Sequence, residues 1–580
     1  MTKKILIGVA WPYVNGDLHL GHLAGYLLPA DIFARFQRLQ GNDVVMISGS
    51  DCYGTPITVE ADKQKTTPQE IVDNYHDKDV SLFKLYNLSY NLYTKTTTPN
   101  HKKVVQELFL QLLKNGYITK GTMHQYYSEI DKKFLPDRYV EGTCPHCNAK
   151  EQRSDQCESC GRWLEDGELL NPVSKETKSP VILKDTEHYF LDFEKLNPEL
   201  TEYVNSKKGI WRDWVFNETS GWLKEGLKKR AITRDMDWAV DLPVEELEKL
   251  DKELQLESYD GKKIYVWFEA VTGYLSAAIE WGEIPMNTNY TDGIFLKQDG
   301  QTGKGLDYWL DPETKIYNFM GQDNLVFHAL MWPFMLIGSK QGYSLPHNVI
   351  VNKFMNLEGK KFSKSRNWTI DSRKMAEKYG SDLVRYYISA NLPENKEGDF
   401  TWENFVSGIN NELVANLGNF INRTLKFFES KYQGSLEDPK FVLDGGLETA
   451  INSCYQKMDK FINNCQFVNA LDELMALGKN ANKYFDDQEI WKTIKSDTKK
   501  AEGVMLNLLN LVSNFGILME PFLPEASVKL AKMMGIEQTA IALGKNYWQI
   551  KKSNAFKLDS TVEILFTKLD PIKVLEEKEN

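Results

Sequence analysis

Residues 3–51, KKILIGVAWPYVNGDLHLGHLAGYLLPADIFARFQRLQGNDVVMISGSD, decide the fold. The short apolar run KKILIGVA predicts a buried strand, and DVVMISGSD predicts a second one. Between them, GHLAGYLLPADIFARFQRLQG predicts a helix that ends near Gly41 and in which Pro29 favours a kink. The apolar stripe of this helix runs through Leu23, Leu27, Ala30 and Ala34, at the spacing of one helix face.

A strand, a helix and a second strand in succession indicate a parallel, Rossmann-like α/β sheet. The pattern G-x-G-x-x-G is absent, which argues against a dinucleotide-binding fold. Instead, His19 and His22 lie at the turn from strand to helix, where such folds hold phosphate at the positive end of the helix. Taken alone, the pattern is more often a capping histidine beside an ordinary loop histidine. The rest of the chain must decide between this structural interpretation and a phosphate-binding role.

Changes in the residue pattern along the chain predict an α/β catalytic domain that is interrupted by an insertion and followed by a helical bundle. Turn residues and cysteines crowd together after Tyr117, strand-then-helix alternation returns after Lys229, and helical patterns dominate after Asn395. The expected segments are 1–116, first half of the α/β domain; 117–229, the insertion; 230–345, second half; 346–394, a linking segment; 395–548, the helical domain; and 549–580, a tail that packs back on the body.

The composition limits the class of protein. A chain of 580 residues is too long for one core, and its net charge of −11 indicates solubility without excluding a nucleic-acid partner. We expect no secretion signal, because the N-terminus lacks a long apolar segment, and no membrane span, because polar residues interrupt the apolar stretch at 504–524. Seven cysteines, an odd number, favour a reducing, cytoplasmic location.

A metal site is predicted by CPHCNAKEQRSDQCESCG, in which two C-x-x-C turns stand nine residues apart. Two such turns can direct four thiolates at one tetrahedral Zn²⁺, although a redox pair or a coincidence would give the same letters. The ligands would be Cys144, Cys147, Cys157 and Cys160. Four thiolates fill the coordination sphere of zinc, so the metal would be structural, with His146 as a bystander.

Two further groups of residues suggest chemistry with a nucleotide and a small apolar ligand. In GKKFSKSRN, the lysines Lys360, Lys361 and Lys364 form either a solvated basic loop or a mobile clamp that stabilises a departing pyrophosphate. Asp51 accompanies a set of aromatic residues, and Tyr13, Asp51 and Trp267 come at or near the C-terminal ends of predicted strands, at the sheet edge where α/β folds bind ligands. The set, each member of which alone is more often core, is Tyr13, Trp267, Tyr274, Phe327, His328 and Trp332. An apolar cage with one carboxylate suits a small apolar amino acid, whose ammonium Asp51 would hold.

The combination resembles the class I aminoacyl-tRNA synthetases. HLGH at His19 to His22 is similar to their HIGH signature, and KFSKS at Lys361 to Ser365 is similar to their KMSKS signature. The methionyl-tRNA synthetase family is the closest resemblance over nearly the whole chain. PYVNGDLHLGH, the zinc knuckle, KKIYVWFEAVTGY, GQDNLVFHALMWP and NELVANLGNFINR are the segments that carry this resemblance.

This resemblance implies that the chain activates L-methionine with Mg²⁺-bound ATP and transfers it to the 3′ end of initiator and elongator tRNA(Met). It implies catalysis by His19, His22 and Lys364, and ATP binding by His19, Gly21, His22, Lys361, Ser363, Lys364 and Ser365. It implies methionine binding by Tyr13, Asp51, Trp267, Ala270, Val271, Tyr274, Phe327 and His328. It implies anticodon contacts by Asn410, Asn416, Arg423 and Trp491.

The sequence departs from the family pattern at several positions. Leu20 and Phe362 are apolar replacements in the two signatures, and Val271 replaces a commoner proline. Gln322 stands where a lysine is frequent, so it receives no role. Some relatives carry a second knuckle, but Ser128 and Asp131 stand there instead of cysteines, and we expect one zinc ion. A monomer is expected, because the dimerising C-terminal extension of some relatives is missing.

Two alternatives remain at this point. A class I synthetase for leucine, isoleucine or valine usually has a far larger editing insertion, and one for cysteine would need zinc with an open position in its pocket. A zinc-dependent nucleic-acid-binding module without catalysis would leave the paired histidines and the lysine loop unexplained.

Overall fold

The computed structural model describes residues 2–130, 132–135, 139–154, 157, 159, 164, 167–284, 301, 304–362, 368–536 and 543–576. Its centre is a five-stranded parallel sheet in the order β15-β14-β1-β2-β3. The strands are β1 (Lys4–Val9), β2 (Asp43–Ser50), β3 (Leu92–Lys95), β14 (Lys315–Gly321) and β15 (Asn348–Asn352). β1, β2 and β14 are mostly apolar and buried because helices cover both faces of such a sheet. The predicted Rossmann-like fold is confirmed.

The first helical segment is continuous but irregular. It consists of α1 (Leu20–His22), the π-helical turn η1 (Leu23–Leu27) and α2 (Leu28–Leu39). The N–H of Leu28 donates to the carbonyl of Leu23, five residues back, and Pro29 stands directly after this wide turn. Proline has no N–H to donate, so a change of hydrogen-bond register immediately before it accommodates the ring without ending the helix.

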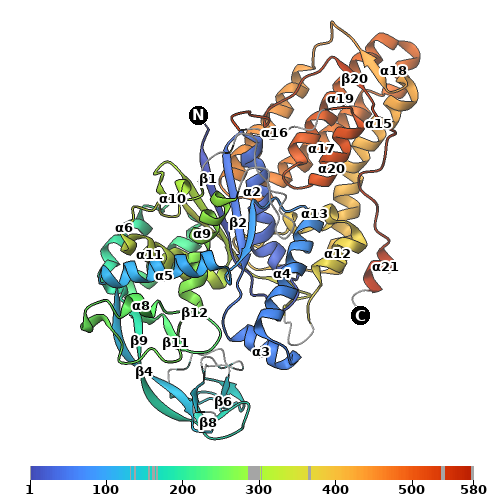
Figure 1. The fold of residues 1–580 in the computed structure, drawn as a ribbon. Helices are drawn as coiled ribbons and strands as arrows, with labels where there is room; N and C mark the ends of the chain where they lie inside the picture. Colours follow the sequence, from blue (N-terminus) through green and yellow to red (C-terminus); the bar gives the residue numbers. More distant parts are fainter. Residues whose placement is uncertain are drawn as a thin grey trace.

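One strand that the sequence places in the parallel sheet lies elsewhere. β13 (Lys262–Ile264) belongs to a separate antiparallel sheet with β11 (Thr233–Asp235) and β12 (Val240–Asp241). A sheet covered on both faces would bury both lysines of β13, whereas here Lys263 stays partly exposed and the buried Lys262 pairs with Asp235. The helix expected after it forms as α9 (Val266–Glu283) and packs on β2 and on α5 (Pro99–Lys114). In Figure 1, β1 and β2 lie between α9 and α2.

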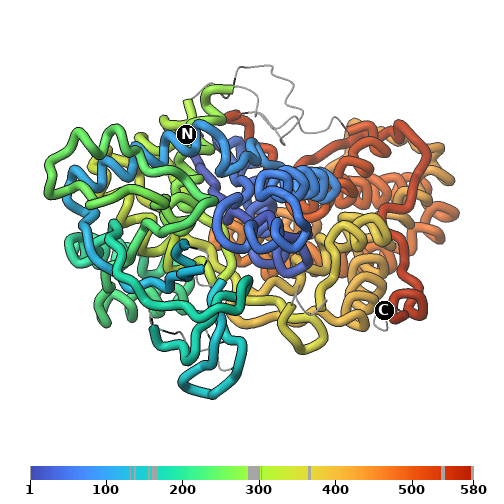
Figure 2. Tube along the Cα trace, turned by 60° about the horizontal axis from the view of Figure 1, so that its bottom comes forward, coloured from blue at the N-terminus to red at the C-terminus, as the bar shows by residue number. Residues whose placement is uncertain are grey.

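The insertion is built on a long antiparallel pair, β4 (Ile118–Ser128) and β9 (Ile182–Leu191). A small sheet of β6 (Val140–Thr143), β7 (Gln152–Arg153) and β8 (Leu170–Ser174) carries the cysteine-rich segment. Figure 1 shows this small sheet at the bottom of the molecule and the C-terminal helices at the top right, and Figure 2 also shows the two parts well separated. The remaining elements are β5 (Lys133–Phe134), η3 (Phe193–Leu196), α6 (Asn197–Asn205), α7 (Asp213–Glu225) and β10 (Arg230–Ala231).

Further elements complete the α/β domain and lead to the C-terminal bundle. They are α3 (Thr55–Gln64), α4 (Pro68–Leu85), α8 (Val244–Leu247), η4 (Lys252–Leu254), α10 (Asp307–Leu310), η5 (Gln322–Asn324), η6 (Phe327–Met331), α11 (Trp332–Ser339), β16 (Met355–Leu357), β17 (Lys360–Lys361), α12 (Ser372–Tyr379), α13 (Ser381–Ala390) and β18 (Gly398–Phe400).

A helical bundle follows, as predicted. Its elements are α14 (Trp402–Ser407), the π-helix η8 (Gly408–Gly418), α15 (Asn419–Tyr432), β19 (Ser435–Glu437), α16 (Gly445–Asn463), α17 (Phe467–Asp487), α18 (Ile490–Ser496), α19 (Thr498–Met519) and α20 (Pro524–Met533). α19 is long and apolar enough to cross a membrane, but 72% of its most apolar window is buried inside the protein. It is a buried helix of the bundle, and the polar residues that interrupt the apolar stretch at 504–524 lie on it or directly after it.

The C-terminal tail packs back on the bundle, as expected. β20 (Ala555–Lys557) pairs with β19, and α21 (Pro571–Leu575) ends the described chain. The side chains of Val562, Phe566 and Val574 are buried.

A buried ion cluster joins α2 to the bundle. Asp31 accepts from Arg35 (3.0 Å) and from Arg385 of α13 (2.7 Å), and neither Asp31 nor Arg385 is exposed. Arg35 also pairs with Glu520, and Arg385 donates to the carbonyls of Pro521 and Phe522 just before α20. The helix that begins at the paired histidines is therefore fixed to the C-terminal domain.

Candidate active site, metal centre and anticodon surface

The paired histidines cap the start of the first helix reciprocally. The N–H of Gly21 donates to Nδ1 of His19, and the N–H of His19 donates to Nδ1 of His22, each at 3.1 Å. A neutral ring whose Nδ1 accepts carries its hydrogen on Nε2. Both rings can therefore offer an N–H donor to a ligand at the positive end of a helical segment.

Gly21 is required by space at this turn. A Cβ atom there would lie 2.9 Å from the His19 ring and 3.5 Å from Phe362. The Phe362 ring stacks on His19 with centroids 4.8 Å apart and planes 6° from parallel. Lys361, one residue earlier, is exposed. The start of the lysine loop thus lies over the histidines, while Ser363, Lys364 and Ser365 fall outside the described residues.

Asp51 lies directly after β2 and forms an isolated parallel bridge with Tyr13, which follows β1. The Asp51 side chain is buried, and its Oδ1 has no hydrogen-bond partner among the described residues. Burial raises the pKa of this carboxyl well above its ordinary value, against an opposing hydrogen bond from the N–H of Tyr53. Such a group gains most from a cationic ligand, which would both pair with it and relieve the cost of its burial.

Aromatic residues from two helical segments form an apolar wall. The Trp267 ring of α9 lies 5.1 Å from that of Phe327 in η6. Tyr274 donates its hydroxyl to Nε2 of His328 (2.6 Å), because Nδ1 of His328 already donates to the Asn324 carbonyl (2.8 Å). Burial lowers the pKa of His328 to about 4, so this wall is uncharged at neutral pH.

The remaining members of the predicted set occupy different positions. Ala270 and Val271 share α9 with Trp267 and Tyr274. Trp332 is fully buried and packs against Trp309, which makes it a core residue.

Sequence reasoning missed a buried polar group behind the wall. Glu269 is fully buried, and its Oε2 lies 2.8 Å from Nε2 of His101 in α5. The His101 ring also lies 6.1 Å from that of Trp11. A Cβ on Gly273 would come within 2.7 Å of the Trp11 ring, so this glycine makes room for the indole. A signal for Glu269 existed, because it is the single charged residue in the apolar run from Val266 to Ile279.

Three of the four predicted zinc ligands converge. The sulfurs of Cys144, Cys147 and Cys157 all lie within 4.8 Å of one another, and those of Cys147 and Cys157 are 3.6 Å apart. Tetrahedral Zn–S bonds of about 2.3 Å place sulfurs roughly 3.8 Å apart, so the described thiols fit this ion. Cys160 lies outside the described residues. His146 is instead near Glu168, at 3.9 Å.

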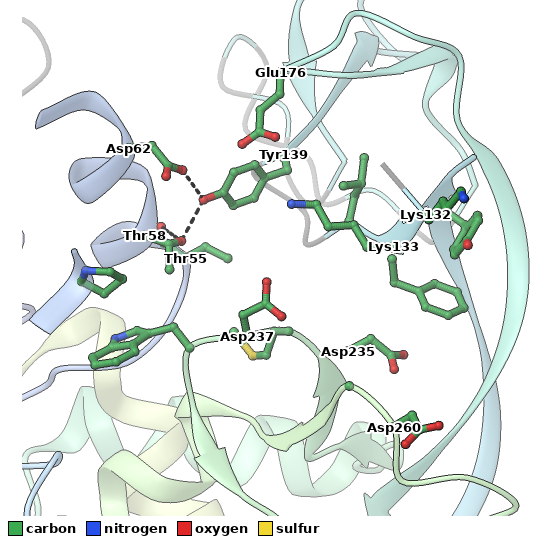
Figure 3. Close-up of a pocket in the computed structure, with 17 residues that line it drawn as sticks. Thr55, Thr58, Asp62, Lys132, Lys133, Tyr139, Glu176, Asp235, Asp237 and Asp260 are labelled. Atoms are coloured by element: carbon green, nitrogen blue, oxygen red, sulfur yellow. Dashed lines mark hydrogen bonds between the residues drawn. The ribbon is translucent and has the colours of Figure 1, made fainter. Parts of the chain in front are cut away.

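A separate cavity of about 590 Å³ lies between α3, the insertion and the loop before β12. Figure 3 shows Tyr139 of the insertion reaching α3, where its hydroxyl lies 2.9 Å from both Thr58 and Asp62. Trp238 lines the same cavity and donates to the Cys52 carbonyl (2.7 Å), next to Asp51. Its carboxylates outnumber its two lysines, which disfavours a polyphosphate and separates this cavity from an ATP site.

The four predicted anticodon residues divide into two pairs. Asn410 is buried and binds both the carbonyl and the N–H of Leu569, and Asn416 is buried and donates to the Met475 carbonyl. These contacts favour structural roles for both amides. Trp491 is 40% exposed and stacks on Phe485 (6.0 Å, 22°), and the Arg423 guanidinium lies 3.8 Å from the centre of the Phe485 ring.

Comparisons with known proteins agree with this geometry. Residues 5–425 match the family described as tRNA synthetases class I (M), and residues 443–576 match the anticodon binding domain of methionyl tRNA ligase. The methionine–tRNA ligase of Dehalococcoides mccartyi (strain CBDB1) is 41% identical over 581 residues, covering 100% of this chain and 99% of that protein. That of Roseiflexus sp. (strain RS-1) is 40% identical, covering 93% and 88%.

A solved structure shows the same fold. The Mycobacterium tuberculosis methionyl-tRNA synthetase, in complex with methionyl-adenylate, superposes with a TM-score of 0.75 at 21% identity, covering 97% of this chain and 100% of that one. The parallel sheet, the histidine turn and the C-terminal bundle are those of a class I aminoacyl-tRNA synthetase. Within that class, the chain belongs to the methionine–tRNA ligase family.

Proposed function

We propose that this chain activates L-methionine with Mg²⁺-bound ATP and transfers the methionyl group to initiator and elongator tRNA(Met) in the cytoplasm. The observation that carries the proposal is the buried Asp51, which lacks a partner for one oxygen and stands beside an apolar aromatic wall. An ammonium and a thioether side chain satisfy these two surfaces together. Tyr13, Ala270, Val271 and Tyr274 complete the side-chain pocket in this assignment.

In the first step, the methionine carboxylate attacks the α-phosphate and pyrophosphate leaves. The Nε2–H groups of His19 and His22 would donate to the phosphate oxygens as negative charge grows on them. Gly21 permits close approach of the phosphates. Lys361 at the end of β17, and Ser363, Lys364 and Ser365 after Phe362, would bind them from the other side. No covalent enzyme nucleophile is needed, since positioning and electrostatic stabilisation supply the catalysis.

In the second step, a hydroxyl of the terminal adenosine takes the methionyl group from the adenylate. Arg423 and Trp491 would contact the anticodon. Both lie against the Phe485 ring, and an exposed indole beside a guanidinium can stack on and hydrogen-bond to unstacked bases. Asn410 and Asn416 would support this surface from inside.

One zinc ion would be held by Cys144, Cys147, Cys157 and Cys160. It would stabilise the insertion and take no part in the reaction, because four thiolates leave no open coordination position. We also propose that the protein acts as a monomer.

The test is amino-acid-dependent exchange of pyrophosphate into ATP, run with each of the twenty amino acids. Methionine should support exchange far better than leucine, isoleucine, valine or cysteine. A preference for any amino acid other than methionine would refute the substrate assignment. Absence of exchange with all twenty amino acids would refute the activity.

A further inference from the structure

A second buried carboxyl group, Glu269, lies close enough to Asp51 for the charge of Asp51 to raise its pKa. Asp51 follows β2 and Glu269 lies on α9, and both are at least nine-tenths buried. Each has one oxygen without a hydrogen-bond partner among the described residues, Oδ1 of Asp51 and Oε1 of Glu269. Two buried anions so placed would repel each other and the carboxylate of the substrate.

The hydrogen bonds of His101 decide where a proton sits. Ser276 donates its hydroxyl to the Gly273 carbonyl (3.1 Å), so its oxygen accepts from Nδ1–H of His101 at 2.8 Å. A neutral His101 then has a bare Nε2, and this atom faces Oε2 of Glu269 at 2.8 Å. One proton must lie between these two atoms.

That proton belongs to Glu269. Burial lowers the pKa of His101 to about 3, so the ring stays neutral. Burial, and then the charge of Asp51, raise the pKa of Glu269 well above its ordinary value. Cys52 and Tyr53 after β2 and Tyr274 on α9 also face the pair, and none of these three is cationic. The one cation that acts on the pair among the described residues, Lys102 on α5, lowers the pKa of His101 further and so favours the proton on Glu269. Among the described residues, no lysine or arginine forms an ion pair with either carboxyl.

We propose that His101 holds Glu269 as a neutral carboxylic acid and that its free Oε1 is a second acceptor for the ammonium of the amino acid, beside the single anion Asp51. An ammonium has three N–H donors, and one carboxylate with one free oxygen does not satisfy them. A neutral acid adds an acceptor without adding a charge that would oppose the attacking carboxylate or the phosphates. The proposal rests on the proposed methionine site.

Glutamine is the decisive replacement. In Glu269→Gln the amide N–H can donate to Nε2 of His101 as the acid does, and the amide oxygen remains as an acceptor. Methionine should bind this variant within about threefold of wild type, with the same pH dependence between pH 6 and 8.5. Glu269→Leu should bind methionine at least about tenfold more weakly, which corresponds to roughly one hydrogen bond to a charged donor. Calorimetry of the full chain with methionine alone measures both.

Infrared difference spectra test the protonation state independently. The wild type should show the carbonyl stretch of a buried carboxylic acid that Glu269→Gln lacks. Glu280→Gln is the matched control, because Glu280 is a mostly buried carboxyl on the same helix that bonds Thr94 instead of His101. This variant should keep the Glu269 band and wild-type methionine affinity.

Three results would overturn the proposal. Equal losses in the Gln and Leu variants, with unchanged melting temperatures, would mean that Glu269 acts as an anion. Wild-type affinity in the Leu variant would mean that Oε1 does not serve the ammonium. No carboxylic acid band at Glu269 would refute the proton assignment, even if the Leu variant fails to fold. By contrast, a wild type that binds another amino acid and not methionine would refute the proposed function and leave the infrared test intact.

Discussion

Replacing Asp31 with asparagine should uncouple the helical segment that begins at the paired histidines from the C-terminal bundle. The change keeps the shape of the side chain but removes the anion that pairs with Arg35 and Arg385. Glu520 would remain as the partner of Arg35, and Arg385 would keep only carbonyl acceptors. A guanidinium left buried without its carboxylate is costly, so the loss should exceed that of any surface ion pair.

The magnitude follows from two estimates. Burial alone would raise the pKa of Asp31, but Arg35 and Arg385 outweigh it and lower the pKa from 3.8 to about 2. A shift of nearly two units corresponds to about 2.5 kcal/mol of stability. Removing one partner of a fully buried pair costs about 3–5 kcal/mol, because the remaining charge stays desolvated. We therefore expect Asp31→Asn to lose about 3–5 kcal/mol.

Urea unfolding at pH 7, followed by tryptophan fluorescence, measures the loss. Lys457→Gln is the matched control, since it breaks an exposed pair with Glu473 and should change stability by less than about 0.5 kcal/mol. The folded-state pKa of Asp31 is depressed, so its contribution is present above about pH 4 and lost as the pH falls towards 2. The variant should lack that part of the acid dependence.

A double-mutant cycle gives the most direct test of the coupling between Asp31 and Arg385. Adding Arg385→Met to Asp31→Asn removes the stranded cation, so the double variant should be less destabilised than the sum of the single variants. Strict additivity would show that the two side chains do not stabilise the junction together.

Three further predictions address the zinc, the loop and the anticodon surface. Cys157→Ser should lower the zinc content and the melting temperature; wild-type protein purified without chelators and found free of zinc would contradict the site. Lys364→Ala should slow adenylate formation about a hundredfold, a cost of about 3 kcal/mol, while leaving methionine affinity nearly unchanged; a normal rate with weakened methionine binding would reverse its role. Trp491→Ala should weaken tRNA charging by about 1–3 kcal/mol and spare pyrophosphate exchange; equal loss of both with a lower melting temperature would make Trp491 a core residue.

The parts of the fold that local patterns determine could be predicted. The strands β1 and β2 are short apolar runs, and the helical segment between them shows its stripe at Leu23 and Leu27. β3 was missed because its four residues, LYTK, include two polar side chains and follow a turn. β13 was misassigned because a short Lys-Lys-Ile run before a helix looks the same in a parallel sheet and in an antiparallel one.

The roles of single asparagines could not be predicted from their neighbours. Asn410 binds the backbone of Leu569, which is 159 residues away, and Asn416 binds that of Met475, 59 residues away. Both amides lie on a π-helical segment whose polar positions the sequence suggests are exposed. Only the packing of the tail and of α17 shows that they are enclosed.

In the candidate site too, residues placed by local sequence patterns could be predicted, and those that depend on distant partners could not. Asp51 can be located from the sequence because it follows a buried parallel strand, and such strand ends share one edge of the sheet. Glu269 cannot be assigned a partner this way, since His101 is 168 residues earlier and lies on a different helix. Its proton depends on Ser276, which donates to Gly273 and thereby leaves His101 with a bare nitrogen towards the carboxyl. The charge of the pocket is thus a property of four residues on two helices, so it can be determined only after α5 and α9 are seen packed together.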